Sequence, residues 1–389
     1  MLLAVAGALG QRRCGEGRAL SVTGFEFLWG SDAFWRRAAR DIALARRRLF
    51  VQAMTFEGDA AGLRVAAAIR DSVAVDRRVL VDAYTRHVVN DRFVWTPSAL
   101  ADSALRNEIR STRAMFVGLA AAGVKVRMTN PVGAFFSGYA ARNHKKLILA
   151  DDVAYIGGVN FSDHNFAWSD FMIRFEGAAA ARFLAEDFEA TFAGVPRSRR
   201  ADINQLRLYS LDGRTNARAF AEVMELMNSA EREITVVSPY LTFPFTDTLA
   251  EARRRGVRVR LITPRVNNKP AAQRYVLAQA LRHGFDVRFA PPMSHVKAIL
   301  IDDEHLIAGS SNFDFVSFAA EEELLAIIAS PALVEEFRKG LNTLLGDVVD
   351  GPSEGVDRSE WLVTALMKIA ACLVRASSAA RRTAIDWPN

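Results

Sequence analysis

Short runs of apolar and β-branched residues alternate with longer amphipathic stretches along most of the chain. The runs lie at 48–55, 78–83 and 123–128 in the first half and at 233–240, 257–263 and 284–289 in the second half. Such runs are typical of buried β-strands, and the stretches between them are long enough to form helices. Strands that alternate with helices predict an α/β fold in which helices cover a β-sheet.

The third run of each half leads into a repeated motif. Residues 143–151 read NHKKLILAD and residues 294–302 read SHVKAILID, so both contain His-x-Lys, four further residues and Asp. Each motif is followed by a Gly-Asn turn, GGVN at 157–160 and GSSN at 309–312. Because the strands, the motif and the turn recur in the same order, the chain is predicted to be a tandem duplication.

The duplication also predicts how the chain divides. Gly, Pro, Ser and Arg cluster at 194–200, and a second Gly- and Pro-containing break lies at 350–355. Such stretches are typical of connections between domains. We therefore expect two α-β-α sandwich domains related by a pseudo-two-fold axis and followed by a tail, at 1–200, 201–350 and 351–389.

Two apolar segments could contact a membrane. Residues 1–9 read MLLAVAGAL, which is too short to span a bilayer and lacks the preceding basic residues of a signal peptide. Residues 361–374 read WLVTALMKIAACLV and are followed by Arg residues, which predicts a C-terminal helix with basic flanks. This helix could dock on the core or lie in the surface of an anionic membrane, and composition leaves both open.

Composition narrows the class of protein. The chain has 389 residues, half of them hydrophobic and 24% charged, which excludes a disordered or fibrous protein. Its formal net charge of +6 favours anionic partners such as nucleic acid, phosphate esters or a membrane, without choosing among them. The only cysteines, Cys14 and Cys372, lie at opposite ends of the chain. This argues against a zinc site or a disulfide framework and favours a reducing compartment.

The repeated polar residues suit the chemistry of a phosphodiester. On a strand, His144 and Lys146 would share one face, as would His295 and Lys297, and two facing edges would unite both pairs in one cleft. One His could attack phosphorus while the other protonates the leaving alkoxide and then activates the acceptor. The lysines, with Asn160 and Asn312, could bind the phosphoryl oxygens in place of a metal ion, so no metal and no other cofactor is expected.

The acidic residue that ends each motif has its own expected role. Asp151 and Asp302 occupy equivalent positions at the end of the two motifs, after the motif lysines Lys146 and Lys297. A carboxylate beside an imidazole can orient the ring and stabilise its charged form. We therefore expect these two aspartates to orient the catalytic histidines or to fix the local charge.

The paired motifs resemble those of the phospholipase D superfamily, over about 27–345. The finer resemblance is to the bacterial cardiolipin synthase branch, in which the second motif typically continues as Gly-Ser-x-Asn-x-Asp with a later Glu. Here Gly309-Ser310-Ser311-Asn312-Phe313-Asp314 and Glu323 occupy those positions. Val316 and Ser169 stand where that branch typically carries Arg.

The resemblance implies a role for each residue. His144 would be the nucleophile and His295 the acid and base, although the symmetry of the motifs leaves this order open. Asp170 and Glu323 would hold the imidazoles, and Ser310 would add a hydroxyl donor. The implied catalytic set is His144, Lys146, Asp151, His295, Lys297 and Asp302, and the implied substrate-binding set is Asn160, Asn312, Ser310, Asp170 and Glu323.

The implied reaction is phosphatidyl transfer, in which two phosphatidylglycerol molecules give cardiolipin and glycerol. The partner would be an anionic phospholipid, with no nucleic acid expected. The chain would act as a monomer with internal pseudo-symmetry, in the cytoplasm and peripherally on the inner face of the cell membrane. Phe135, Phe136 and Tyr139 could line an apolar entrance for acyl chains. Two alternatives remain: a phospholipase D hydrolase that releases phosphatidic acid, and a phosphodiesterase or nuclease acting on nucleic acid.

Overall fold

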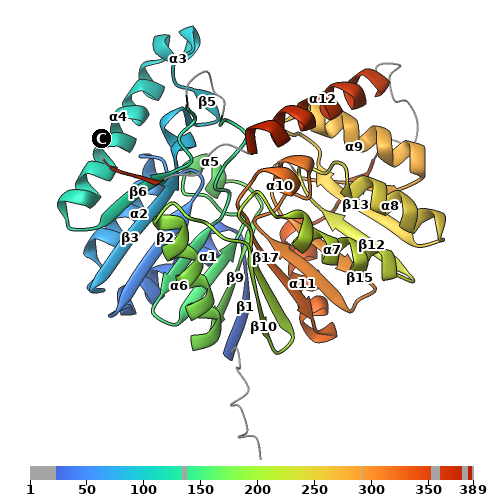
Figure 1. The fold of residues 1–389 in the computed structure, drawn as a ribbon, viewed down its shortest axis with the longest axis horizontal. Coiled ribbons are helices and arrows are strands. Elements are labelled where there is room, and N and C mark those ends of the chain that lie inside the picture. Colours follow the sequence, from blue (N-terminus) through green and yellow to red (C-terminus); the bar gives the residue numbers. More distant parts are fainter. Residues whose placement is uncertain (1–22, 134–137, 292, 352–359, 379–383, 388–389) are drawn as a thin grey trace, which may run out of the picture.

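Two mixed β-sheets stand side by side in the computed structural model (Figure 1). The structure describes residues 23–133, 138–291, 293–351, 360–378 and 384–387. The first sheet has the strand order β1 (Thr23–Trp29), β9 (Phe171–Glu176), β8 (Val153–Gly157), β7 (Leu147–Ala150), β2 (Arg48–Ala53), β3 (Asp76–Asp82), β6 (Lys125–Thr129) and β19 (Ala384–Asp386).

The second sheet repeats this arrangement. Its order is β10 (Arg199–Ile203), β11 (Leu206–Ser210), β17 (Leu324–Ala329), β16 (His305–Gly309), β15 (Ala298–Ile301), β12 (Glu233–Val237), β13 (Arg258–Pro264), β14 (Asp286–Ala290) and β18 (Val349–Asp350). The six strands from β9 to β6 match the six from β17 to β14 in order and in every parallel or antiparallel pairing. The predicted duplication and its six upstream strands are therefore confirmed.

Helices cover both faces of each sheet. The first half contains α1 (Ser31–Leu44), α2 (Ala60–Asp71), α3 (Pro97–Ala101), α4 (Ser103–Ala121), α5 (Asp163–Phe166) and α6 (Ala178–Phe192), together with the short 3-10 helix Ala83–Arg86 and the ribbon of β4 (Val88–Val89) and β5 (Arg92–Phe93). The second half contains α7 (Ala217–Ser229), α8 (Phe245–Arg254), α9 (Pro270–His283), α10 (Phe315–Ala319), α11 (Pro331–Leu345) and α12 (Glu360–Ser378).

One hydrophobic core joins the two halves. It combines side chains from the inner faces of both sheets with those of α6 and α11, including Phe188 and Phe337. Phe337 packs against Trp29 of β1, with ring centroids 4.8 Å apart, so a helix of the second half contacts a strand of the first. Separate cores lie on the outer faces, beneath α1 and α2 in the first half and α7 and α8 in the second. The predicted pair of α-β-α sandwiches is confirmed.

The predicted C-terminal tail packs against both halves. Helix α12 packs against α9 and α10 of the second half, whereas β19 pairs antiparallel with β6 of the first sheet. Next to β19, the Trp387 ring lies 5.5 Å from Phe116. The C-terminal segment therefore connects the outer parts of both halves (Figure 1). None of the described helices is both long and apolar enough to cross a bilayer.

Candidate active site

Each motif segment pairs with a segment of the other half. The amide N–H of His144 donates to the carbonyl of Glu322, at 2.9 Å, and that of His295 donates to the carbonyl of Ser169, at 2.8 Å. Their partners lie two residues before β17 and β9, which occupy equivalent places in the two sheets. The motif histidines and lysines were expected on strands, but β7 and β15 begin only at Leu147 and Ala298, because these pairings with the other half take the place of strand pairing.

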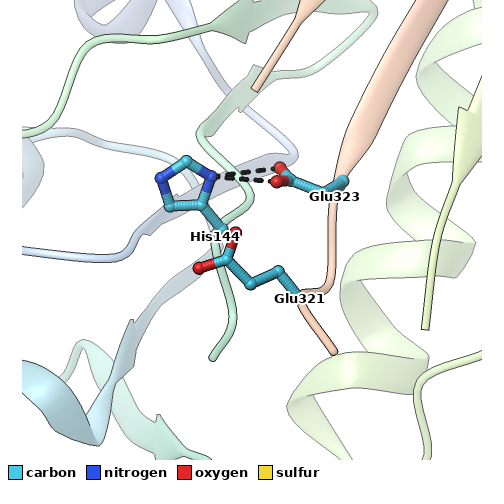
Figure 2. Close-up of side chains that lie close together, drawn as sticks. All are labelled: His144, Glu321 and Glu323. Carbon is cyan, nitrogen blue, oxygen red and sulfur yellow. Dashed lines mark hydrogen bonds and ion pairs between the residues drawn. The ribbon is translucent and has the colours of Figure 1, made fainter. Parts of the chain in front are cut away.

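Each imidazole is held by a carboxylate from the opposite half. Nδ1 of His144 lies 3.1 and 3.2 Å from the two carboxylate oxygens of Glu323 (Figure 2), and Nδ1 of His295 lies 2.8 Å from Oδ2 of Asp170. A carboxylate at Nδ1 favours the tautomer with the proton on that nitrogen, which leaves the lone pair on Nε2. Both Nε2 atoms are then able to attack phosphorus or accept a proton.

Each motif lysine donates a hydrogen bond to the backbone of its own motif. The Nζ atom of Lys146 donates to the carbonyl of His144, and that of Lys297 donates to the carbonyl of His295, both at 2.7 Å. Both side chains are fully buried. Within the described part of the chain, neither ammonium forms an ion pair with a carboxylate within 4.0 Å. Two buried lysines beside two imidazoles form a site that suits an anionic group, whose charge would in turn favour the charged form of both lysines.

Burial and mutual repulsion shift the pKa values of these groups. Burial lowers the pKa of Lys146 to about 8 and that of Lys297 to about 7. Burial, reinforced by the charge of Lys297, lowers the pKa of His295 to about 3, and burial with the charge of Lys146 holds the pKa of His144 well below its ordinary value. Both imidazoles are therefore neutral near pH 7, the state required of a nucleophile or a base.

Two serines fix Glu323. The hydroxyl of Ser310 donates to one carboxylate oxygen of Glu323, and the hydroxyl of Ser317, on α10, lies 2.9 Å from the other. Ser310 was expected to donate to the substrate; this expectation is wrong, because its hydroxyl is fully buried and engaged by Glu323. At the equivalent position stands Gly158, where a Cβ atom would collide with the carboxylate of Asp170. Asp170, which is shorter than Glu323, thus requires glycine at the position that Ser310 occupies in the other half.

The two motif asparagines lie in buried turns after β8 and β16. Asn160 donates to the side-chain oxygen of Asn165 and accepts from the amide of Thr55, both at 3.4 Å. The side-chain oxygen of Asn312 is buried and has no hydrogen-bond partner among the described residues. Their predicted role in phosphate binding stays a prediction.

Asp151 and Asp302 do not reach the imidazoles, so the prediction that they orient the histidines is wrong. They lie in the turns that follow β7 and β15, with φ of 54° and 51°, at the far end of each strand from the motif histidine. Each carboxylate instead accepts three backbone N–H groups at 2.7–3.0 Å, from Arg46, Arg47 and Arg48 and from Glu231, Arg232 and Glu233. Their repeated position reflects a structural role in both halves.

The structure also places residues near the site that sequence reasoning did not assign to it. The Trp168 ring lies 4.8 Å from the His295 ring, and the Tyr240 ring lies 6.4 Å from it. Lys269 has its ammonium 4.1 Å from the centre of the Tyr240 ring. Trp168 directly precedes Ser169 and Asp170, and Tyr240 ends the predicted run 233–240, so both stood next to recognised features, whereas Lys269 lies in a loop without a repeated pattern. Phe135 and Phe136, proposed to line an apolar entrance, lie outside the described residues.

His144, Glu321 and Glu323 lie close enough together to share a cation (Figure 2). The Glu323 oxygens, however, already accept hydrogen bonds from Ser310 and Ser317, and Ser317 also lies 3.0 Å from Glu321. Lys146 adds a positive charge that acts directly on Glu323. These donors fit a hydrogen-bonded network around His144 better than a metal site, and the expected absence of a metal stays a prediction.

The fold and the site have parallels among known proteins. A family model described as "Cardiolipin synthase, PLD-like domain" matches residues 223–345. Minor cardiolipin synthase ClsB of Bacillus subtilis is 28% identical over 247 residues, which cover 55% of this chain and 59% of that protein. Cardiolipin synthase B of Escherichia coli (strain K12) is 25% identical over 355 residues, covering 82% of this chain and 80% of that protein.

Solved structures support the fold. The phosphatidylserine synthase of Haemophilus influenzae has a TM-score of 0.66 at 15% identity and covers 92% of this chain and 97% of its own. The polyphosphate kinase of Porphyromonas gingivalis has a TM-score of 0.54 at 13% identity and covers 90% of this chain and 56% of its own. The tandem arrangement of two similar halves is therefore shared with proteins of low sequence identity.

Proposed function

This chain belongs to the phospholipase D superfamily, and on that premise we propose that it is a phosphatidyltransferase that makes cardiolipin from two molecules of phosphatidylglycerol. The relatives named above are cardiolipin synthases, and the paired motifs supply the same chemistry in both halves. The observation that carries the proposal is the pairing of two neutral imidazoles, each fixed through Nδ1, with two buried ammonium groups that have no carboxylate partner among the described residues.

The first step would form a covalent intermediate. Nε2 of His144 attacks phosphorus, the bond from phosphorus to the glycerol oxygen breaks, and His295 gives a proton to the departing oxygen. The phosphate charge would be bound by Lys146 and Lys297. His295 is neutral in the free site, but a bound anion opposes the charges that lower its pKa. The acid form is therefore expected only with substrate in place.

The second step would reverse these roles. His295 accepts the proton from a glycerol hydroxyl of the second phosphatidylglycerol, the oxygen attacks phosphorus, and the bond to Nε2 of His144 breaks. Cardiolipin leaves and the enzyme returns to its starting state. If water replaces the glycerol hydroxyl, the same site releases phosphatidic acid, so access of the acceptor decides between transferase and hydrolase.

We also propose that the chain works as a monomer in the cytoplasm, peripherally on the inner face of the cell membrane. Helix α12 supports the proposed contact with the membrane. It rests on α9 and α10, while Leu366, Ile369 and Leu373 stay 55, 58 and 67% exposed and recur at the spacing of one helical face. A row of exposed apolar side chains on a helix can enter the interface of a bilayer.

Product analysis tests the proposed reaction. The protein is incubated with labelled phosphatidylglycerol in vesicles, with EDTA present, and the lipids are separated by chromatography. Cardiolipin and glycerol are expected, and the variant His144→Asn should give neither. Phosphatidic acid as the main product would support the hydrolase instead. No lipid product, together with cleavage of single-stranded DNA, would support the nuclease, and activity that requires Mg²⁺ would contradict the metal-free mechanism.

A further inference from the structure

A third lysine lies beside the two motif lysines. Lys269 ends the loop between β13 and α9, and its ammonium lies 4.1 Å from the centre of the Tyr240 ring. That ring is itself 6.4 Å from the ring of His295. The Tyr240 ring is therefore a common neighbour of the Lys269 ammonium and of His295, the proposed acid and base. Lys269 is one of only seven lysines in the chain.

The charge of Lys269 affects the pKa values of groups in both halves of the site. It contributes to lowering the pKa of His144 in the first half and of Lys297 in the second. Desolvation by the surrounding protein opposes the charge of Lys269, although the residue stays accessible to solvent. The nearby Tyr240, Asp314 and Glu321 outweigh this effect and raise its pKa above the ordinary value. Lys269 therefore keeps its positive charge throughout the neutral range.

The ammonium of Lys269 is available to a ligand. Its side chain is exposed, whereas both motif lysines are fully buried. Among the described residues, Nζ has the Tyr240 ring as a contact but no hydrogen-bond or ion-pair partner. Tyr240 is fixed by a hydrogen bond from its hydroxyl to Asn268, and Asn268 donates to Asp91 of the first half at 3.2 Å. The Lys269 ammonium is thus held against the Tyr240 ring, and hydrogen bonds from both halves fix the position of this ring.

The chemistry of the proposed reaction requires a second anion site. In cardiolipin, one phosphate stands at each end of a three-carbon glycerol bridge. When the phosphate being transferred lies between the motif lysines, the phosphate of the acceptor lies a glycerol away, and it is also negatively charged. His295, which would activate the acceptor hydroxyl, is the motif histidine whose ring lies next to the Tyr240 ring.

We propose that Lys269 binds the phosphate of the acceptor phosphatidylglycerol, which makes it a specificity residue for an anionic acceptor. This inference rests on the proposed function, and it assigns to Lys269 a task distinct from that of Lys146 and Lys297. A neutral acceptor has no phosphate to bind. Lys269 should therefore matter for transfer to phosphatidylglycerol and not for transfer to a simple alcohol.

The test compares two acceptors in the variant Lys269→Gln. A charge-assisted hydrogen bond contributes a few kcal/mol, so cardiolipin formation should fall by about 10- to 100-fold in kcat/KM for phosphatidylglycerol as acceptor. Transfer of the phosphatidyl group to ethanol should stay within about twofold, and phosphatidic acid should rise relative to cardiolipin. Lys269→Arg should retain most of the cardiolipin synthesis, because it preserves the charge.

Lys339→Gln is the matched control, since Lys339 is an exposed lysine on α11 that lies 3.4 Å from Glu335. An unchanged ratio of cardiolipin to phosphatidic acid in Lys269→Gln would overturn the assignment. An equal loss of transfer to both acceptors would place Lys269 at the donor site and overturn it as well. If the unmodified protein makes neither cardiolipin nor the ethanol product, the proposed function itself fails, which is a distinct outcome.

Discussion

At the scale of single residues, Glu323 combines a positioning role in the site with an electrostatic conflict. It holds the imidazole of His144 from the opposite half, yet it is fully buried. Burial raises its pKa to about 7, against the opposing effects of Lys146 and of the hydrogen bonds from Ser310 and Ser317. An ionised Glu323 therefore serves to position His144 at a cost in stability, which is common where function sets the residue.

This conflict predicts a pH-dependent effect of Glu323→Gln. Because the folded-state pKa is raised, the contribution of protonated Glu323 is fully present below its ordinary value of 4.5 and is lost as the pH rises through about 7. The variant, which cannot ionise, should be more stable than the unmodified protein by about 1–3 kcal/mol at pH 8 and little different at pH 5. Denaturant unfolding at both pH values measures this. A variant that is less stable at pH 8 would contradict the account.

A contrasting prediction concerns Asp151. Its carboxylate accepts three backbone N–H groups at a turn remote from the histidine. Asp151→Ala should lower the free energy of unfolding by about 1–3 kcal/mol, because these donors lose their acceptor, and should leave the turnover rate of the folded enzyme unchanged. Asp151→Asn should cost less, since Asn tolerates the positive φ of this position. If folded Asp151→Ala protein instead turned over about two orders of magnitude more slowly, its catalytic assignment would be restored.

At the scale of elements, α12 presents two different faces. Its inner face packs on α9 and α10 and buries Ala371, whereas Leu366, Ile369 and Leu373 point to solvent. The docked alternative for this helix is therefore confirmed for its inner face, and membrane contact by its exposed face stays a prediction. The exposed face is covered by less than half within the described part of the chain, so its substitution should affect binding to a surface more than folding.

Replacing all three of these residues with Ser should weaken binding to vesicles of phosphatidylglycerol by about tenfold or more, because buried apolar area is lost at the bilayer interface. The melting temperature should change little. Sedimentation with vesicles measures the binding. The control is Val73→Ser with Val75→Ser, which changes two residues 59 and 89% exposed just before β3, remote from the motifs. Unchanged sedimentation of the α12 variant would refute its role in membrane binding.

The elements, the repeat and the meeting of both motifs in one site could be predicted from the sequence, but several of the individual side-chain contacts could not. Strand runs such as 48–55 reveal themselves by local apolar pattern, and the His-x-Lys motif by repetition. Repetition alone cannot separate a catalytic Asp from one that caps a turn, so Asp151 was misassigned. Ser310 was misassigned because its hydrogen bond to Glu323 is seen only in the folded chain. Lys269 has no repeated counterpart, and its loop carries no local signal.

At the scale of the whole molecule, the halves depend on each other for chemistry. Each His–carboxylate pair takes its imidazole from one half and its acid from the other. The shared core around α6 and α11 fixes this arrangement, because it packs both sheets against the same helices. Neither half alone contains a complete His–carboxylate pair from this set, so catalysis is expected only from the folded duplication.

The most direct test of this account is to trap the covalent intermediate. The enzyme is mixed briefly with labelled phosphatidylglycerol and quenched in alkali, and its peptides are analysed by mass spectrometry. The account predicts a phosphatidyl adduct on His144 that is absent from His144→Asn. An adduct on His295 alone would contradict the assignment of the nucleophile. Cardiolipin formation with no adduct on either histidine would contradict the two-histidine mechanism.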